Sequence, residues 1–96
     1  MSGAPLTAQQ ADAILAPFIV MGRSHSWLRF KTIEAWVHHD LAAGLLLMIE
    51  RGLVASTYTL YRHGEQMFQL SDSPRAVTVI QLATAVAPYL PVSQAN

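Results

Sequence analysis

The sequence predicts an α+β domain in which three helices are followed by a two-stranded β-hairpin and a final helix. Three observations lead to this order. Apolar residues recur at helical spacing before Gly52, β-branched and aromatic residues alternate with polar ones after Val54, and a proline-marked helix start follows Ser73. Because 96 residues suffice for one hydrophobic core, we expect a single domain over residues 1–96.

The composition is unusually apolar, and the chain carries no net charge. Hydrophobic residues make up 52% of the chain and charged residues 12%, so few charges are available for the surface. Six Lys and Arg residues balance six Asp and Glu residues, which gives no general attraction to a polyanion. The absence of cysteine excludes disulfides and thiolate chemistry. The apolar excess favours self-association.

The sequence contains no recognisable targeting or membrane-spanning segment. Its first residues, MSGAPLTAQQ, have neither the basic nor the apolar region of a secretory signal. The two most apolar runs, Leu41 to Ile49 and Ala76 to Leu90, are shorter than the roughly 20 residues that a membrane-spanning helix needs. We therefore expect a cytoplasmic protein that does not interact with membranes.

A first helix is predicted over about residues 7–21. Thr7 and Gln10 have the spacing of a capping box, in which each side chain bonds to the backbone of the other residue. Gly22 is a natural helix terminator, whereas Pro17 would kink or shorten the helix because it lacks a backbone N–H.

Two further helices are predicted before Gly52. The second would begin at Ser24 or Ser26, because the residues that follow place both tryptophans on one apolar face. The third would run from Leu41 to Arg51, with Asp40 as its N-cap and Gly52 as the left-handed residue that ends it.

A β-hairpin is predicted after Val54. Its turn is placed at Arg62-His63-Gly64, with Gly64 in the left-handed conformation. A three-residue turn there would pair Tyr58 with Phe68 across the two strands. The face that we expect to be buried contains Ser56, Tyr58, Leu60, Phe68 and Leu70, and the opposite face contains Thr57, Thr59, Tyr61, Met67 and Gln69.

The final helix is predicted over about residues 74–90, with Ser73 as its cap and Pro74 in its first turn. It is apolar around most of its circumference, which is more apolar surface than one small domain covers. We therefore expect this helix to join two copies in a homodimer, with a buried core helix as the alternative. The predicted dimer interface consists of Val77, Ile80, Ala83, Thr84, Ala87 and Leu90.

The predicted order of elements and the run Met48-Ile49-Glu50-Arg51-Gly52-Leu53-Val54 resemble the winged helix-turn-helix superfamily of small bacterial regulators. The resemblance covers about residues 24–72 and rests also on the hairpin and on Leu70-Ser71 at its close. It implies a winged-helix fold, in which the third helix enters the major groove and the hairpin tip lies along the neighbouring backbone.

The resemblance implies a DNA-binding transcriptional repressor that recognises a near-palindromic site as a homodimer. Carried over by position, Arg and Lys side chains would contact phosphates, and His and Ala at the start of the third helix would contact bases. The predicted DNA-binding residues are Arg23, Arg29, Lys31, His38, His39, Ala42, Ala43, Arg62 and His63. The alternative is a winged-helix adaptor that binds another protein and no DNA.

The sequence shows no motif typical of catalysis. The carboxylates fall singly along the chain, and neither a glycine-rich phosphate loop nor a nucleophile elbow is present. His38-His39-Asp40 has donor atoms for a metal, but adjacent histidines point in different directions and no His-x3-His spacing supports them. We expect no enzyme activity, no metal, no cofactor and no small-molecule ligand.

Overall fold

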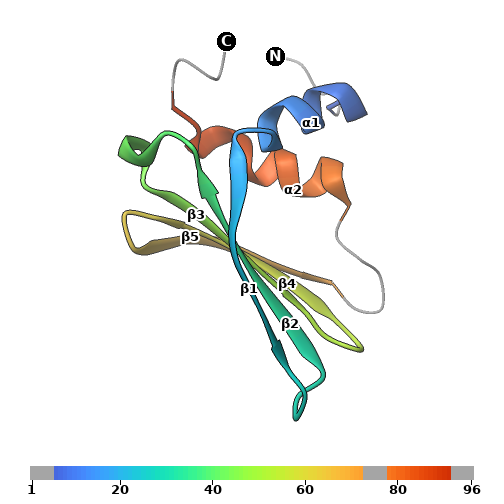
Figure 1. Cartoon of the computed structure of the whole chain (residues 1–96). Helices are drawn as coiled ribbons and strands as arrows, with labels where there is room; N and C mark the ends of the chain where they lie inside the picture. Colours follow the sequence, from blue (N-terminus) through green and yellow to red (C-terminus); the bar gives the residue numbers. More distant parts are fainter. Residues whose placement is uncertain (1–5, 73–77, 92–96) are drawn as a thin grey trace.

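A computed structural model of the chain shows one five-stranded antiparallel sheet with two helices on one of its faces (Figure 1). The structure describes residues 6–72 and 78–91. Each strand pairs with the next one along the chain. The strands are β1 (Phe18–Ser26), β2 (Lys31–His38), β3 (Leu45–Arg51), β4 (Ser56–Arg62) and β5 (Glu65–Asp72). The helices are α1 (Ala8–Leu15) and α2 (Val79–Val86), with two 3-10 turns, η1 (Leu41–Ala43) and η2 (Ala87–Tyr89).

The predicted winged-helix fold is wrong, although helices and strands are both present as an α+β class requires. The segment predicted as the second helix forms the end of β1, a turn and β2. The segment predicted as the third helix forms η1 and β3. The predicted wing is therefore not an appendage of a helical domain, because its two strands continue the sheet as β4 and β5.

The region around Asp40 shows how the third helix was mispredicted. The Asp40 carboxylate does cap a helical turn, since it accepts a hydrogen bond from the Ala42 N–H at 3.2 Å. Gly44 then adopts a left-handed conformation, with φ of 66°, and ends that turn after three residues. The following segment, Leu45–Arg51, is apolar at its first five positions, a pattern that suits a buried central strand as well as a helix.

The segment predicted as the second helix contains strand β2, because its residues favour an extended backbone. Thr32, Ile33 and Val37 are β-branched, and such side chains pack well on a pleated surface. The two tryptophans do not share a core-facing surface. Trp36 packs against the core from β2, whereas Trp27 lies in the turn after β1 and is 83% exposed.

The turn between β4 and β5 is tighter than predicted. Gly64 has a positive φ of 83°, as the sequence indicates, but His63 also has a positive φ, of 51°. Arg62 pairs with Glu65, so the turn contains two residues. Positive φ at both central positions is the requirement of the tight hairpin turn whose twist matches that of the flanking strands.

A bulge in β5 restores the apolar pairing that a two-residue turn alone would lose. Met67 is an extra residue on β5, so Leu60 pairs with Phe68 and Tyr58 pairs with Leu70. The predicted pairing of Tyr58 with Phe68 is therefore wrong by two residues. Because the shift is an even number, the predicted apolar side chains still lie on one face of the sheet.

Helix α1 begins where the sequence predicts and ends earlier. Thr7 accepts from the Gln10 N–H at 3.1 Å, and the Gln10 side chain accepts from the Thr7 N–H at 2.9 Å, so the capping box is present. The helix ends at Leu15, and Phe18 begins β1, so the predicted helix over residues 7–21 is too long. Pro17 cannot donate a helical hydrogen bond, which explains the early end.

Helix α2 begins at Val79, later than the predicted start near residue 74. Thr78 and Gln81 form a second capping box, with N–H to side-chain distances of 2.8 and 3.1 Å. The predicted cap and first-turn proline, Ser73 and Pro74, lie outside the described residues.

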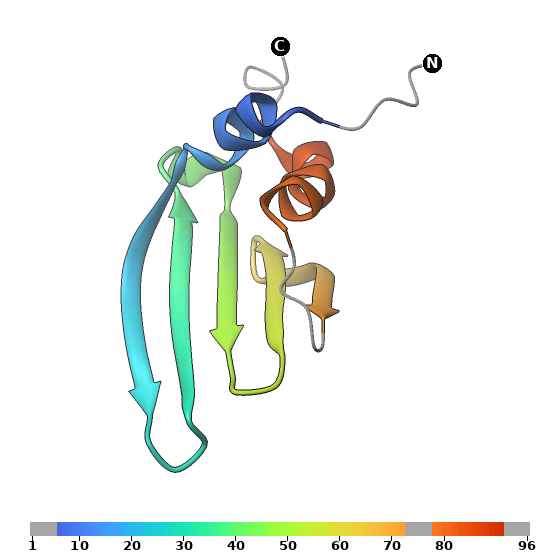
Figure 2. The same cartoon turned by 90° about the vertical axis from the view of Figure 1, so that its right-hand side faces the viewer.

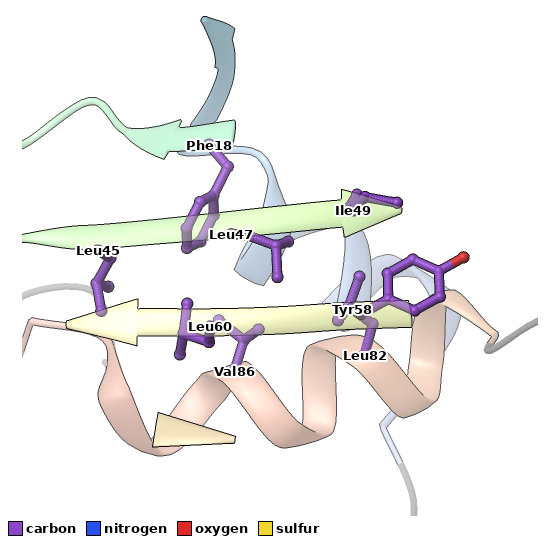
Figure 3. Close-up of a cluster of buried hydrophobic side chains, with 8 residues drawn as sticks. All are labelled: Phe18, Leu45, Leu47, Ile49, Tyr58, Leu60, Leu82 and Val86. Carbon is purple, nitrogen blue, oxygen red and sulfur yellow. The ribbon is translucent and has the colours of Figure 1, made fainter. Parts of the chain in front are cut away.

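The hydrophobic core lies between the sheet and the helices (Figure 3). Its buried side chains come from β1, β3, β4 and α2, and they are Phe18, Leu45, Leu47, Ile49, Tyr58, Leu60, Leu82 and Val86. Ala11 of α1 and Ala83 of α2 have no exposed surface, because the two helices pack against each other. The small alanine side chains allow this close approach.

The helices cover one face of the sheet and one end of it, and the turns after β1 and β3 project beyond them (Figure 2). No described helix covers the other face of the sheet.

Candidate interaction surface

The uncovered face of the sheet is formed by the side chains that alternate with the core residues along each strand. We call this surface the open face. Its apolar centre consists of residues from β2, β3 and β4, all partly buried by one another, namely Ile33, Ala35, Val37, Leu46, Met48 and Tyr61. The polar residues beside this centre are Lys31, Glu50, Thr57, Thr59, Gln69 and Ser71.

Strand β3 is apolar on both of its faces. Leu45, Leu47 and Ile49 are 2%, 3% and 5% exposed in the core. Leu46 and Met48 point to the open face, where Leu46 lies between Val37 of β2 and Tyr61 of β4. A strand with one solvated face alternates apolar with polar residues, and β3 does not. A contiguous apolar row of this kind is a candidate contact surface for a partner.

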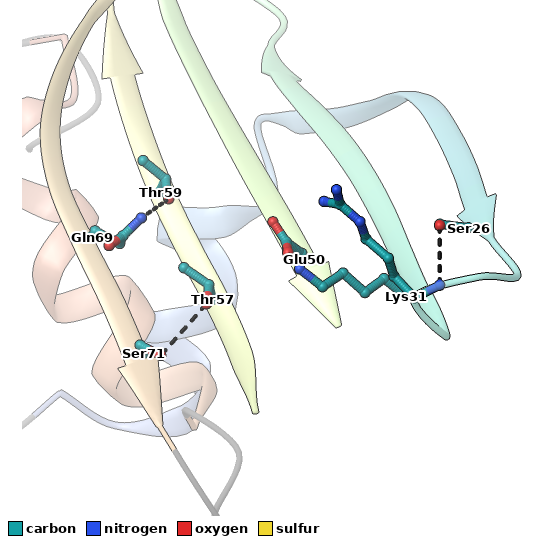
Figure 4. A network of polar contacts seen from close by, with 8 residues as sticks. Ser26, Lys31, Glu50, Thr57, Thr59, Gln69 and Ser71 are labelled. Atoms are coloured by element: carbon teal, nitrogen blue, oxygen red, sulfur yellow. Dashed lines mark hydrogen bonds and ion pairs between the residues drawn. The ribbon is translucent and has the colours of Figure 1, made fainter. Parts of the chain in front are cut away.

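The polar side chains of the open face satisfy one another (Figure 4). The pairs are Lys31 with Glu50, Gln69 with Thr59, and Thr57 with Ser71. The Gln69 amide donates to the Thr59 hydroxyl at 3.2 Å, and Thr59 is 6% exposed. The desolvation free energy of covering these groups with a partner is therefore lower than that of burying unpaired polar atoms.

The two projecting turns carry further apolar side chains, beyond the polar residues Lys31, Glu50 and Thr57 of the open face. Their exposed side chains are Trp27, Leu28 and Phe30 after β1, and Leu53 and Val54 after β3, with exposures from 63% to 95%. A groove of about 410 Å³ lies between the turns, and its lining includes Lys31, Glu50 and Thr57 of the open face. The open face and the turns thus form one continuous surface.

The predicted DNA-binding residues do not form one surface. Arg23, Arg29 and Lys31 lie near the turn after β1, and the others lie at the opposite end of the strands. A strand of eight residues is about 26 Å long, so the two groups are separated by roughly the length of the sheet. The second group consists of His38, His39, Ala42, Ala43, Arg62 and His63.

Most of the predicted phosphate-binding cations have partners within the chain. The Arg23 guanidinium donates to Glu34 at 2.8 Å, and Lys31 forms an ion pair with Glu50. The Arg62 guanidinium lies 5.5 Å from the centre of the Tyr89 ring. Carboxylates therefore balance the charges of Arg23 and Lys31, whereas the ring contact leaves the charge of Arg62 in place.

His38 is not presented to a partner, because 1% of it is exposed. Its Nδ1 accepts a hydrogen bond from the Asp40 N–H at 3.0 Å, and its ring lies edge-on to Phe18 and His39. The imidazole therefore supports the connection between β2 and η1. His39 is exposed, and Ala43 packs partly against the core.

The residues of the predicted dimer interface differ in how far they are buried within the chain. Ala83 is completely buried within the chain, whereas Thr84 is exposed and donates its hydroxyl to the Ile80 carbonyl at 2.7 Å. Three other residues of this predicted interface are partly buried, namely Ile80, Ala87 and Leu90. Val77 lies outside the described residues. Much of the apolar surface of α2 is thus covered by the sheet and by α1.

The sequence prediction missed the open face because it assigned β2 and β3 to helices. The available signal was the run Leu45 to Ile49, which is apolar at both alternating sets of positions, beside the β-branched residues of β2. Within the described ranges, no group of three or more His, Cys, Asp or Glu residues is placed to hold a metal ion. None of the described helices has the length and apolar character needed to cross a bilayer.

Comparison with protein-family models, with curated proteins and with solved structures gives no match for this chain.

Proposed function

We propose that this protein is a homodimeric interaction module in which the open face of one copy packs against the open face of a second copy. The observation that carries the proposal is the apolar row formed by Val37, Leu46 and Tyr61 across three neighbouring strands. The proposal agrees with the homodimer expected from the composition. It differs in placing the contact on the sheet and not on the last helix. The predicted alternative was a winged-helix adaptor, and the proposal keeps only its binding to protein, because the winged helix is absent.

The geometry of a sheet pair suits such a dimer. Two sheets pack face to face at about 10 Å, with their side chains interdigitating. Met48 lies near the middle of β3, which is the central strand of the sheet. In a two-fold arrangement, a residue at the centre of the face comes close to the same residue of the second copy.

The charges of the open face favour a second copy over a charged partner. Lys31 and Glu50 neutralise each other within the face, so two identical faces do not repel. A polyanion would need unpaired cations, which the centre of the face lacks. The whole chain is also neutral, which removes long-range repulsion between copies.

The oligomeric state of a charged variant tests this proposal. We expect sedimentation velocity to show a dimer of the wild-type protein at about 10–100 μM, and a monomer of Met48→Glu, because two carboxylates would face each other in an apolar contact. Leu41→Glu is the matched control. Leu41 is an exposed apolar residue of η1, outside the open face, so its substitution should leave the dimer intact.

A charge-swap experiment separates a broken interface from a damaged fold. Met48→Glu and Met48→Lys should each be monomeric and folded by circular dichroism, and an equimolar mixture should recover a heterodimer. A wild-type monomer at 100 μM, or a Met48→Glu dimer as stable as the wild type, would contradict the proposal.

A further inference from the structure

A second apolar cavity lies on the helix side of the sheet, opposite the open face. It has a volume of about 340 Å³ and opens between β2–β4 and the two helices. Its walls come from α1, the sheet and α2, and include Phe18, Trp36, Leu47, Ile49 and Leu82. This volume is within the range of sites for small ligands.

The cavity has a polar end. Among the described residues that line it, Arg51 is the one charged group, and the Tyr58 hydroxyl adds a hydrogen-bond donor. Figure 3 shows the Tyr58 hydroxyl pointing past Leu82 and away from the packed core. Within the described part of the chain, this hydroxyl makes no hydrogen bond to another residue. An apolar cavity with two donors at one end suits a ligand that is apolar with a polar head.

The charges beside Arg51 make this end of the cavity positive. Glu34 accepts hydrogen bonds from Arg23 at 2.8 Å and from the Trp36 indole at 3.3 Å. The Arg51 guanidinium lies farther from Glu34, at 3.6 Å. Two guanidiniums thus share one carboxylate, which leaves one excess positive charge. Because Arg51 is farther from Glu34 than Arg23 is, the charge of Arg51 is the less neutralised of the two.

Glu34 is ionised at neutral pH. Burial by itself would raise the pKa of the Glu34 carboxyl, but hydrogen bonds from Arg23 and Trp36, and the charges of Arg23 and Arg51, outweigh burial and hold this pKa below its usual 4.5. The carboxylate therefore keeps its charge, and a second carboxylate can approach Arg51 only from the side that Glu34 leaves free.

We propose that this cavity binds a small amphipathic carboxylate, an unbranched acid of roughly ten carbons whose tail lies beside Trp36 and Leu82 and whose carboxylate pairs with Arg51. The Tyr58 hydroxyl donates a second hydrogen bond to the same carboxylate. This site differs from the sequence expectation of no small-molecule ligand. It is also separate from the proposed dimer contact, because the two surfaces lie on opposite faces of the sheet.

A pair of ligands with matched tails tests the role of charge. The chain contains two tryptophans, so in the Trp27→Phe variant Trp36 is the sole tryptophan and its fluorescence reports on the cavity. We expect saturable fluorescence changes with decanoate and with decanol, and an affinity for decanoate that is higher by about tenfold.

Three substitutions in the Trp27→Phe background identify the groups responsible. Arg51→Met should weaken decanoate binding by about tenfold and leave decanol binding within about twofold. Val79→Glu adds a carboxylate at the half-exposed rim and should weaken decanoate binding, whereas the neutral Val79→Gln should not. Arg62→Met removes a cation at the far end of the sheet and should change neither affinity.

The outcomes separate this proposal from the dimer proposal. Decanoate binding that weakens by about tenfold in Arg51→Met but is unchanged in the Met48→Glu variant supports the cavity, whatever the oligomeric state of the protein. No Trp36 response to either ligand, or equal loss of decanol and decanoate in an Arg51→Met protein that unfolds at the wild-type temperature, would overturn it.

Discussion

The carbonyl of Gly44 accepts the backbone N–H of His63 at 2.8 Å, and the His63 ring occupies the space beside the Gly44 α-carbon. A β-carbon on Gly44 would lie 2.3 Å from Nδ1 of His63. Both residues have positive φ, 66° for Gly44 and 51° for His63. This contact joins the end of η1 to the turn between β4 and β5, so two turns that are distant in sequence support each other.

Gly44→Ala should destabilise the protein by about 2 kcal/mol or more, because the left-handed backbone and the collision with His63 both oppose a side chain. Urea unfolding measures this change. Gly22→Ala is the matched control, since a β-carbon there meets nothing within 4 Å and no positive φ is involved. Its effect should stay within about 0.5 kcal/mol. Equal stability of the two variants would mean that the Gly44–His63 contact is not formed.

Leu60→Ala should cost about 2–5 kcal/mol of unfolding free energy, because Leu60 has no exposed surface and its removal leaves a cavity beneath the helices. Leu53→Ala changes the same residue type at a site that is 82% exposed, and should have an effect within about 0.5 kcal/mol. Thermal and urea unfolding of the two variants compare the core with the projecting turn. Similar losses in both would contradict the assignment of the core to the helix side of the sheet.

Signals that depend on a few adjacent residues predicted local structure well. Thr7 with Gln10 forms its capping box, Asp40 caps a helical turn, and Gly64 is left-handed. Each of these depends on a hydrogen bond or a steric limit within four residues of chain. Such features form in the same way whatever the rest of the fold is.

The type of the longer elements could not be predicted in the same way. The segment Leu45–Arg51 is apolar at positions that suit a helix and a central strand equally, and its pairing with β2 and β4 decides between them. Those partners are distant in sequence, so no local pattern shows them. The open face could not be predicted either, because its residues share a surface only after three strands have paired.

The predicted DNA binding depended on a recognition helix that the structure does not contain. With Arg23 and Lys31 paired to carboxylates, we expect a 30-base-pair duplex to bind weakly, with a Kd above about 10⁻⁴ M at physiological salt. Fluorescence anisotropy at several salt concentrations measures this affinity. Affinity that falls steeply with salt would instead show several phosphate contacts, and would restore a nucleic-acid function on a surface other than a winged helix.

The ion pairs of Glu34 should make stability depend on pH. Its pKa is lowered in the folded protein, so its carboxylate stabilises the fold above the unfolded value of 4.5, and this contribution is lost as the pH falls through the lower folded value. Glu34→Gln should therefore cost about 1 kcal/mol at pH 7, because Arg23 and Arg51 lose their partner, and the cost should shrink as the pH falls below 4.5. Glu65→Gln, at an exposed position beside the last turn of the sheet, is the control and should show no such trend. Urea unfolding from pH 3 to pH 7 measures both variants, and a constant difference between wild type and Glu34→Gln over that range would exclude the proposed role of this carboxylate.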